Sequence, residues 1–134
     1  MGSKIEWGLL GGRLTLGIIM LAHGIQKLGG IESTVAMFEK IGQPAWLAYA
    51  TAIIEAAGGA FLILGIFVVP SAILLGLTMI GAIVLVKFQM GLIGGYEFPL
   101  SLLGLSFILA FTGSKKFAIS EVLLNKNKEI DQHS

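Results

Sequence analysis

The stretch Ala45–Val68, AWLAYATAIIEAAGGAFLILGIFV, decides the fold of this chain, because Glu55 is the only charged residue in it. A helix needs about 20 consecutive, mostly apolar residues to cross the hydrocarbon core of a bilayer. The stretch meets that requirement. We therefore predict a transmembrane helix over residues 45–68, with one carboxylate held inside the membrane.

Three further apolar windows flank this stretch, at residues 7–28, 71–88 and 98–113. Of the 134 residues, 55% are hydrophobic and 13% are charged, and the mean hydropathy is +0.89. These values lie outside the range of soluble globular domains. A soluble bundle of buried helices would also need polar faces that the windows lack. The sequence predicts an all-α membrane protein in which residues 1–113 form a four-transmembrane-helix bundle.

The connections between the windows predict further features. Residues 32–41 have the pattern of a short amphipathic helix on the membrane interface, and Trp46 would anchor its end. Simple interfacial packing is one interpretation of this helix, and a lid over a binding site is the other. The connection around Pro70 is very short, so the second and third membrane helices should form a tight antiparallel hairpin.

Lysines near the ends of the spans predict the orientation, because membrane topology responds to basic residues there. Lys4 precedes the first window, and residues 114–134 form a basic tail after the last one. Both termini are therefore expected in the cytoplasm, in a multi-pass protein of the plasma membrane. The tail should hold one or two amphipathic turns and then a polar, disordered end. The first window is too long and too charged for a cleaved signal peptide.

The residue types exclude several kinds of redox centre. The chain has no cysteine, which excludes disulfides, thiol redox pairs, iron–sulfur ligation and cysteine zinc sites. Its two histidines are too few for a haem pair or a copper centre within one chain, so we expect no metal site. No dinucleotide-binding glycine motif follows a strand. We expect neither a covalently bound cofactor nor a nucleic-acid partner.

Ionisable residues inside the predicted spans form the candidate site. Arg13, His23 and Lys27 fall within one sector of the first helix, and Glu55 lies in a stripe of small residues on the second. A charge that faces lipid costs roughly 3 kcal/mol or more, so these side chains should point into the bundle. We predict that Glu55 lies near the midplane, with Arg13 on one side of it and His23 on the other.

Four polar residues are expected around the outer mouth of the same cavity: Lys27, Lys87, Tyr96 and Glu97. Gln26 is expected next to them. Provided that the lysines stay charged, cations outnumber carboxylates in this cluster. The excess of positive charge favours an electron-rich or anionic ligand.

Three segments carry most of these residues. They are GGRLTLGIIMLAHGIQKLGG (residues 11–30), IIEAAGGAFLILGIFVVPSA (53–72) and GGYEFPLSLLGLSFILAFTG (94–113). Together they resemble the DoxX family of small four-helix membrane proteins of bacteria and archaea. The resemblance covers nearly the whole chain and includes, in order, Arg13, His23, Gly24, Lys27, Glu55, Gly59 and Tyr96 to Pro99.

The resemblance implies a membrane component of a quinone-linked oxidoreductase, or of a system that detoxifies quinones and catechols under oxidative stress. A quinone or catechol-like ring would insert from the bilayer between the first, second and fourth membrane helices. His23 and Lys27 would donate hydrogen bonds to its oxygens, and Glu55 would exchange protons while Arg13 holds Glu55 in place. The catalytic candidates are thus His23, Lys27 and Glu55; the ligand-binding candidates are Arg13, Gln26, Lys87, Tyr96 and Glu97. Electrons would come from a soluble redox partner on the cytoplasmic tail.

The chain departs from the family pattern at two places. Lys87, in VKFQMGL, stands where the family usually has a histidine near the end of the third helix, which weakens a mechanism with two histidines. The glycine-rich ending typical of the family is here GSKKFAIS, so contacts with a cytoplasmic partner are expected to differ.

Two other interpretations of the charged cluster stay open. It is either a structural ion-pair network in a non-catalytic scaffold or accessory subunit, or a pathway for protons or small ions. Glycine-rich helix faces also favour self-association, so we expect that the chain can form a homo-oligomer.

Overall fold

The computed structural model describes residues 2–134, and most of these residues are helical. Met1 lies outside the described residues. The helices are α1 (Gly2–Gly29), α2 (Ile31–Lys40), α3 (Ala45–Leu64), α4 (Val68–Ala82), α5 (Glu97–Thr112) and α6 (Ile119–His133). A π-helical turn at Ile83–Lys87 and a 3₁₀ turn at Phe88–Met90 continue α4, and a second π-helical stretch at Leu92–Tyr96 leads into α5.

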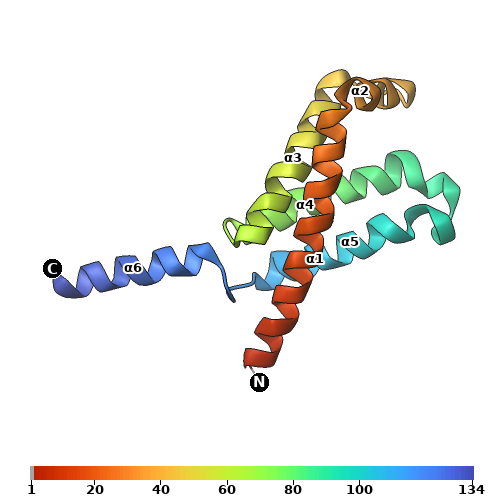
Figure 1. The fold of residues 1–134 in the computed structure, drawn as a ribbon. Helices are drawn as coiled ribbons and strands as arrows, with labels where there is room; N and C mark the ends of the chain where they lie inside the picture. Colours follow the sequence, from red (N-terminus) through yellow and green to blue (C-terminus); the bar gives the residue numbers. More distant parts are fainter. Residues whose placement is uncertain (1) are drawn as a thin grey trace.

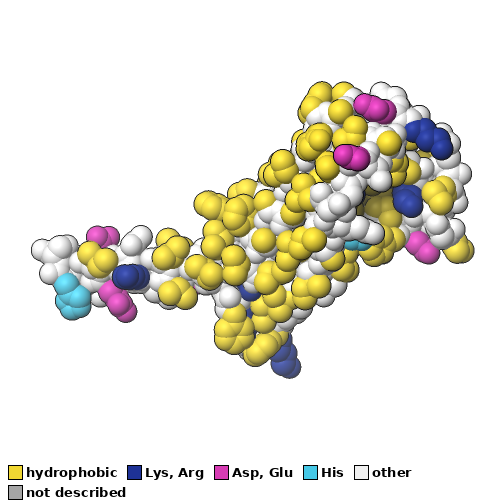
Figure 2. Space-filling view, turned by 45° about the horizontal axis from the view of Figure 1, so that its top comes forward, with side chains coloured by type: hydrophobic (Ala, Val, Ile, Leu, Met, Phe, Trp, Pro, Cys, Tyr) yellow, Lys and Arg dark blue, Asp and Glu magenta, His cyan; other side chains and the backbone are white. Residues whose placement is uncertain are grey.

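Four helical segments are long and apolar enough to cross a membrane: Gly2–Gly29, Ala45–Leu64, Val68–Met90 and Leu92–Thr112. Figure 2 shows hydrophobic side chains over most of the visible face of the bundle, whereas many of the charged side chains lie around α2 and along α6. An apolar outer surface is what lipid contact requires, because hydrocarbon does not solvate charge. The predicted four-helix membrane fold is confirmed.

The membrane helices form two pairs, α1 with α3 and α4 with α5. In Figure 1 the two pairs cross at an angle, α2 lies across the far end of α1 and α3, and α6 projects away from the bundle. The turn between α3 and α4 joins the pairs. We call the end that holds this turn and the start of α1 the terminal end, and the opposite end the α2 end.

Glycines bring α1 and α3 into close contact. A Cβ added at Gly24 would lie 2.6 Å from the Cα of Ala56, and one at Gly59 would lie 2.7 Å from the carbonyl oxygen of Gly17. Small residues are typical of membrane helix interfaces, because dispersion contacts between close backbones supply much of the association energy in lipid. This contact sets the relative register of α1 and α3.

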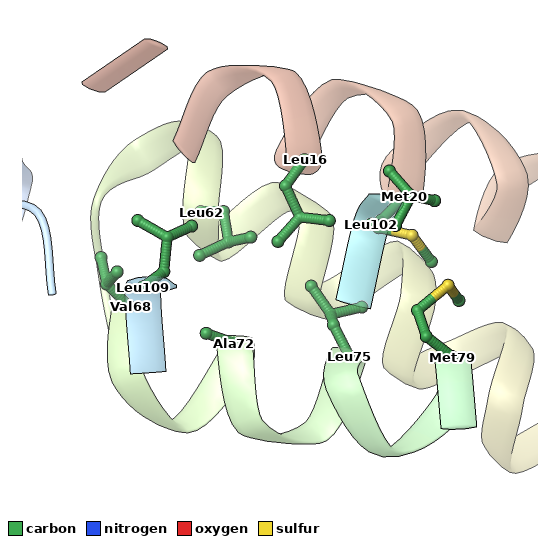
Figure 3. Close-up of a cluster of buried hydrophobic side chains, with 9 residues drawn as sticks. All are labelled: Leu16, Met20, Leu62, Val68, Ala72, Leu75, Met79, Leu102 and Leu109. Atoms are coloured by element: carbon green, nitrogen blue, oxygen red, sulfur yellow. The ribbon is translucent and has the colours of Figure 1, made fainter. Parts of the chain in front are cut away.

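A hydrophobic core fills the space where the two pairs converge. Figure 3 shows Met20 of α1 and Met79 of α4 pointing toward one another, with Leu75 beside them. The cluster comprises Leu16, Met20, Leu62, Val68, Ala72, Leu75, Met79, Leu102 and Leu109. Its members lie between the middle of the membrane helices and the terminal end, which leaves the α2 end less tightly filled.

Several helix ends differ from the predicted ones. The second membrane helix stops at Leu64 rather than residue 68, because Gly65 adopts a left-handed conformation with φ of 72°. The third starts at Val68 rather than residue 71, which places Pro70 in its first turn as expected. The interfacial helix occupies Ile31–Lys40, close to the predicted residues 32–41.

The tail is more regular than predicted. Beyond a short extended segment, residues 119–133 form one helix instead of a few turns followed by a disordered end. The polar composition of the tail led to the wrong prediction, because four branched apolar residues within it recur at helical spacing.

Candidate functional site

A cavity of about 510 Å³ opens between the two helix pairs toward the α2 end. Its floor is formed by core residues Met20, Met79 and Leu102, and α2 contributes Met37 and Phe38 to its wall. The remaining lining comes mostly from apolar side chains of α3, α4 and α5. The volume and the apolar lining are typical of a small-molecule site.

One ion pair lies in the wall of this cavity. The Lys27 ammonium of α1 is 2.7 Å from both carboxylate oxygens of Glu55 on α3. Both residues line the cavity, but Lys27 faces the open space more than Glu55 does, because the Lys27 side chain is 25% exposed and the Glu55 side chain is 2% exposed. Both residues are therefore paired inside the bundle, as the cost of placing charge in lipid requires.

Two more predicted residues line the cavity. His23, one turn before Lys27 on α1, lies next to Phe98 of α5, with 5.8 Å between their ring centroids. Lys87 ends the π-helical turn after α4. Among residues 2–134 no carboxylate pairs with Lys87. Turns of π-helix often occur at functional sites, and here the turn ends with the only lysine of the cavity wall that has no such partner among the described residues.

Sequence reasoning missed part of this site. Thr51 and Thr78 add hydroxyl groups to the lining, and Phe98 covers His23. A single threonine in an apolar window gives no signal of its own. The helical spacing of Thr51 and Glu55 does place both residues on one face, in the predicted stripe of small residues around Glu55, but it does not show that this face lines a cavity.

Arg13 lies elsewhere, and its predicted contact with Glu55 is wrong. Gly24 packs against Ala56, so the level of Glu55 is set near Gly24, about 16 Å along α1 from Arg13. Arg13 is instead 1% exposed at the terminal end. Its guanidinium donates to the carbonyl oxygen of Ser114 at 3.2 Å, to the Ser114 hydroxyl at 3.3 Å and to the carbonyl oxygen of Phe117 at 3.4 Å.

Arg13 therefore holds the segment between α5 and α6. We expect Arg13→Gln to lower the free energy of unfolding by about 2 kcal/mol or more, because buried carbonyls lose a charged donor. Amide exchange at Ser120, which donates to the carbonyl of Gly65 at 3.3 Å, should accelerate at least tenfold. Hydrogen exchange with mass spectrometry measures this. Lys4→Gln, an exposed cation at the same end, is the control, and unchanged exchange in Arg13→Gln would contradict the assignment.

The other three candidates do not line the cavity. Gln26 is exposed on α1. The ring of Tyr96 stacks on Phe88 with 5.9 Å between centroids. Glu97 accepts a hydrogen bond from the amide of Gly94 at 3.0 Å, which stabilises the turn before α5. Of the predicted ring of polar residues at the mouth, Lys27 and Lys87 remain. Tyr96 and Glu97 instead make contacts with nearby residues of the connection before α5.

The model of the DoxX family matches residues 8–88 of the chain. The chain belongs to the DoxX family. The matched residues contain the ion pair of the cavity, His23 and Lys87, whereas α5 and α6 follow them. The family resemblance seen in the sequence is confirmed, and this DoxX chain is a membrane protein.

A relative extends the similarity over the C-terminal helices. This DoxX chain is 38% identical over 128 residues to a protein of Bacillus subtilis (strain 168) named "Putative oxidoreductase CatD". The match covers 96% of both chains, so it includes α5 and most of α6. No solved structure matches the chain.

Proposed function

We propose that the cavity binds a quinone or catechol-like ring, and that this DoxX protein is the membrane component of a quinone-linked oxidoreductase or detoxification system. The observation that carries the proposal is the Lys27–Glu55 pair in the wall of an otherwise apolar cavity of about 510 Å³. An aromatic ring with two oxygen atoms matches such a lining. The name of the Bacillus subtilis relative supports redox chemistry in the same family.

The rim of the cavity suits a ligand that arrives from the bilayer. Met37 of α2, Leu77 of α4 and Leu85 of the following π-helical turn line the cavity and are also exposed on the outside of the bundle. An apolar rim lets a hydrophobic ring pass from lipid without contact with water. The lid interpretation of α2 remains a prediction, supported by the place of Met37 and Phe38 in the cavity wall.

The polar groups have distinct parts in the proposed reduction. Lys27 and His23 donate hydrogen bonds to the ligand oxygens and stabilise the negative charge that develops on them. Glu55 exchanges protons with these oxygens, and Lys87 adds a second positive charge at the mouth. Conversion of a quinone to a quinol takes two electrons and two protons. A soluble reduced partner supplies the electrons.

Tryptophan fluorescence in nanodiscs tests ligand binding. Trp46 precedes the cavity residue Leu47, whereas Trp7 lies against Phe117 at the terminal end. With Trp7→Phe as background, a water-soluble ubiquinone or menaquinone analogue should quench Trp46 saturably. The converse background, Trp46→Phe, measures quenching that results from partition of the analogue into lipid.

His23→Ala should weaken this binding about tenfold, the equivalent of one hydrogen bond of roughly 1.4 kcal/mol. Gln26→Ala is the matched control, because Gln26 lies on the same helix but outside the cavity. Saturable quenching that depends on His23 alone supports the site. Equal effects of both changes, or quenching that never saturates, would refute it.

The alternative is a scaffold or accessory subunit without chemistry of its own. The observation in its favour is that Lys27 contacts both oxygens of Glu55, so the pair needs no ligand to be satisfied. Ligand binding by a stable variant that lacks both charges separates a structural pair from a ligand-binding one.

A further inference from the structure

α6 projects from the terminal end, yet its root is firmly attached to the bundle (Figure 1). Arg13 binds the carbonyl groups of Ser114 and Phe117, and the amide of Ser120 donates to Gly65 at 3.3 Å. Gly65 is closely covered, because a Cβ added there would lie 2.6 Å from the Cβ of Ala118. These contacts fix where α6 starts, while no other helix of the described chain packs extensively along it.

One face of α6 is apolar and uncovered. At about 100° per residue, Ile119, Val122, Leu123 and Ile130 fall within one sector. We call these four residues the α6 stripe. All four are exposed, Val122 by 67% and Ile130 by 57%. A stripe of this kind on a membrane protein needs an apolar environment that the bundle itself does not supply.

The position of Lys126 indicates which apolar environment covers the α6 stripe. It lies in the same sector as the α6 stripe, between Val122 and Ile130. Of the three carboxylates of α6, Glu121 and Asp131 lie well outside this sector, and Glu129 lies at its edge beside Val122. A second copy or an apolar protein groove would bury this ammonium at considerable cost. At a bilayer surface the aliphatic stem of a lysine stays among apolar groups while its charge reaches the phosphates.

The root of α6 carries the residues of a membrane boundary. Trp7 and Phe117 meet edge to face with 5.9 Å between centroids, and the ammonium of Lys116 lies 4.5 Å from the centre of the Trp7 ring. Tryptophan and lysine concentrate at the headgroup level of membrane proteins. The α6 stripe therefore begins at the depth of the headgroups and continues the lipid-facing surface of the bundle.

We propose that α6 lies along the membrane at the terminal end, with the α6 stripe at the boundary of headgroups and acyl chains. Lys126, together with Lys115 and Lys116 at the root, meets the phosphates of anionic phospholipids. This membrane contact is independent of the cavity and of any redox reaction. It leaves the opposite face of α6 as the surface available to a soluble partner.

Adjacent leucines provide a matched test, because Leu123 belongs to the α6 stripe and Leu124 does not, although they are 55% and 53% exposed. The chain has no cysteine, so Leu123→Cys and Leu124→Cys can each carry a single environment-sensitive fluorophore. The proteins are placed in nanodiscs of zwitterionic lipid with and without about one-third anionic lipid, containing brominated acyl chains as quenchers. Quenching at position 123 should exceed that at position 124 at least threefold when anionic lipid is present.

Substitution of the lysine tests the charge contribution. Lys126→Gln should remove most of the dependence on anionic lipid, whereas Lys128→Gln, on the opposite face, should leave it unchanged. Equal quenching at positions 123 and 124 would overturn the proposal. So would energy transfer between copies labelled at position 123 without lipid quenching, because a second copy would then cover the α6 stripe.

Discussion

Glu55→Gln is expected to lower the free energy of unfolding by about 3–5 kcal/mol, the usual cost of breaking one side of a buried ion pair. The carboxylate is 2% exposed and accepts two contacts of 2.7 Å from Lys27, so its loss leaves an ammonium in an apolar wall. Reversible unfolding in mixed micelles of mild detergent and dodecyl sulfate measures the change. Glu97→Gln, which removes an exposed carboxylate at the start of α5, should cost less than about 1 kcal/mol.

The double variant Lys27→Met with Glu55→Gln tests whether the ion pair takes part in ligand binding. It should recover most of the lost stability, because neither side of the pair is left charged. Loss of quinone binding in this stable variant would assign a ligand role to the pair. Retained binding would show that the pair stabilises the fold and does not contribute to ligand binding. A neutral effect of Glu55→Gln alone would contradict the burial of an unsolvated pair.

Gly24→Ala is the substitution with the second largest expected effect. The new Cβ would lie 2.6 Å from the Cα of Ala56 and 2.7 Å from its Cβ, and a backbone atom cannot move aside as a side chain does. α1 and α3 must separate, which should cost about 2–3 kcal/mol, at the upper end of ordinary overpacking. The same unfolding assay measures it, and ligand binding should weaken because Lys27 lies one turn beyond Gly24.

Gly11→Ala is the matched control in the same helix. A Cβ at Gly11 meets nothing within 4 Å, so this change removes a flexible residue from α1 without a clash. It should be neutral or stabilise the protein by up to about 1 kcal/mol, the helix-propensity difference between the residues. If Gly24→Ala behaved like Gly11→Ala, the close contact between α1 and α3 would not exist in the membrane.

The candidate site was predictable in part. Inward charges follow from the cost of charge in lipid, and His23, Lys27, Glu55 and Lys87 all line the cavity. Their pairing was not predictable, because several cations shared a sector of α1 and helical periodicity gives direction without depth. The close contact between Gly24 and Ala56 places Glu55 at the level of Lys27, with which it pairs. Arg13 lies at the terminal end, where it binds Ser114.

The connections were harder to predict than the helices. Glu97 and Tyr96 do not lie at the predicted mouth of the cavity. Glu97 accepts a hydrogen bond from Gly94, and Tyr96 stacks on Phe88. The polar composition of the tail concealed α6, in which apolar residues recur at helical spacing. Short-range contacts in turns depend on backbone conformations such as the positive φ of 75° at Gly94, which a residue pattern does not specify.

By itself, the sequence determined the membrane environment, the number of membrane helices and the residues that turn inward. The physical reason is the large transfer free energy of apolar and charged groups between water and hydrocarbon, which acts on each segment independently. The tertiary structure alone decided the register of α1 against α3, the partner of Glu55, the cavity and the attachment of Arg13 to the tail. These depend on close contacts between segments far apart in the chain, whose energies differ by small amounts until the backbones meet.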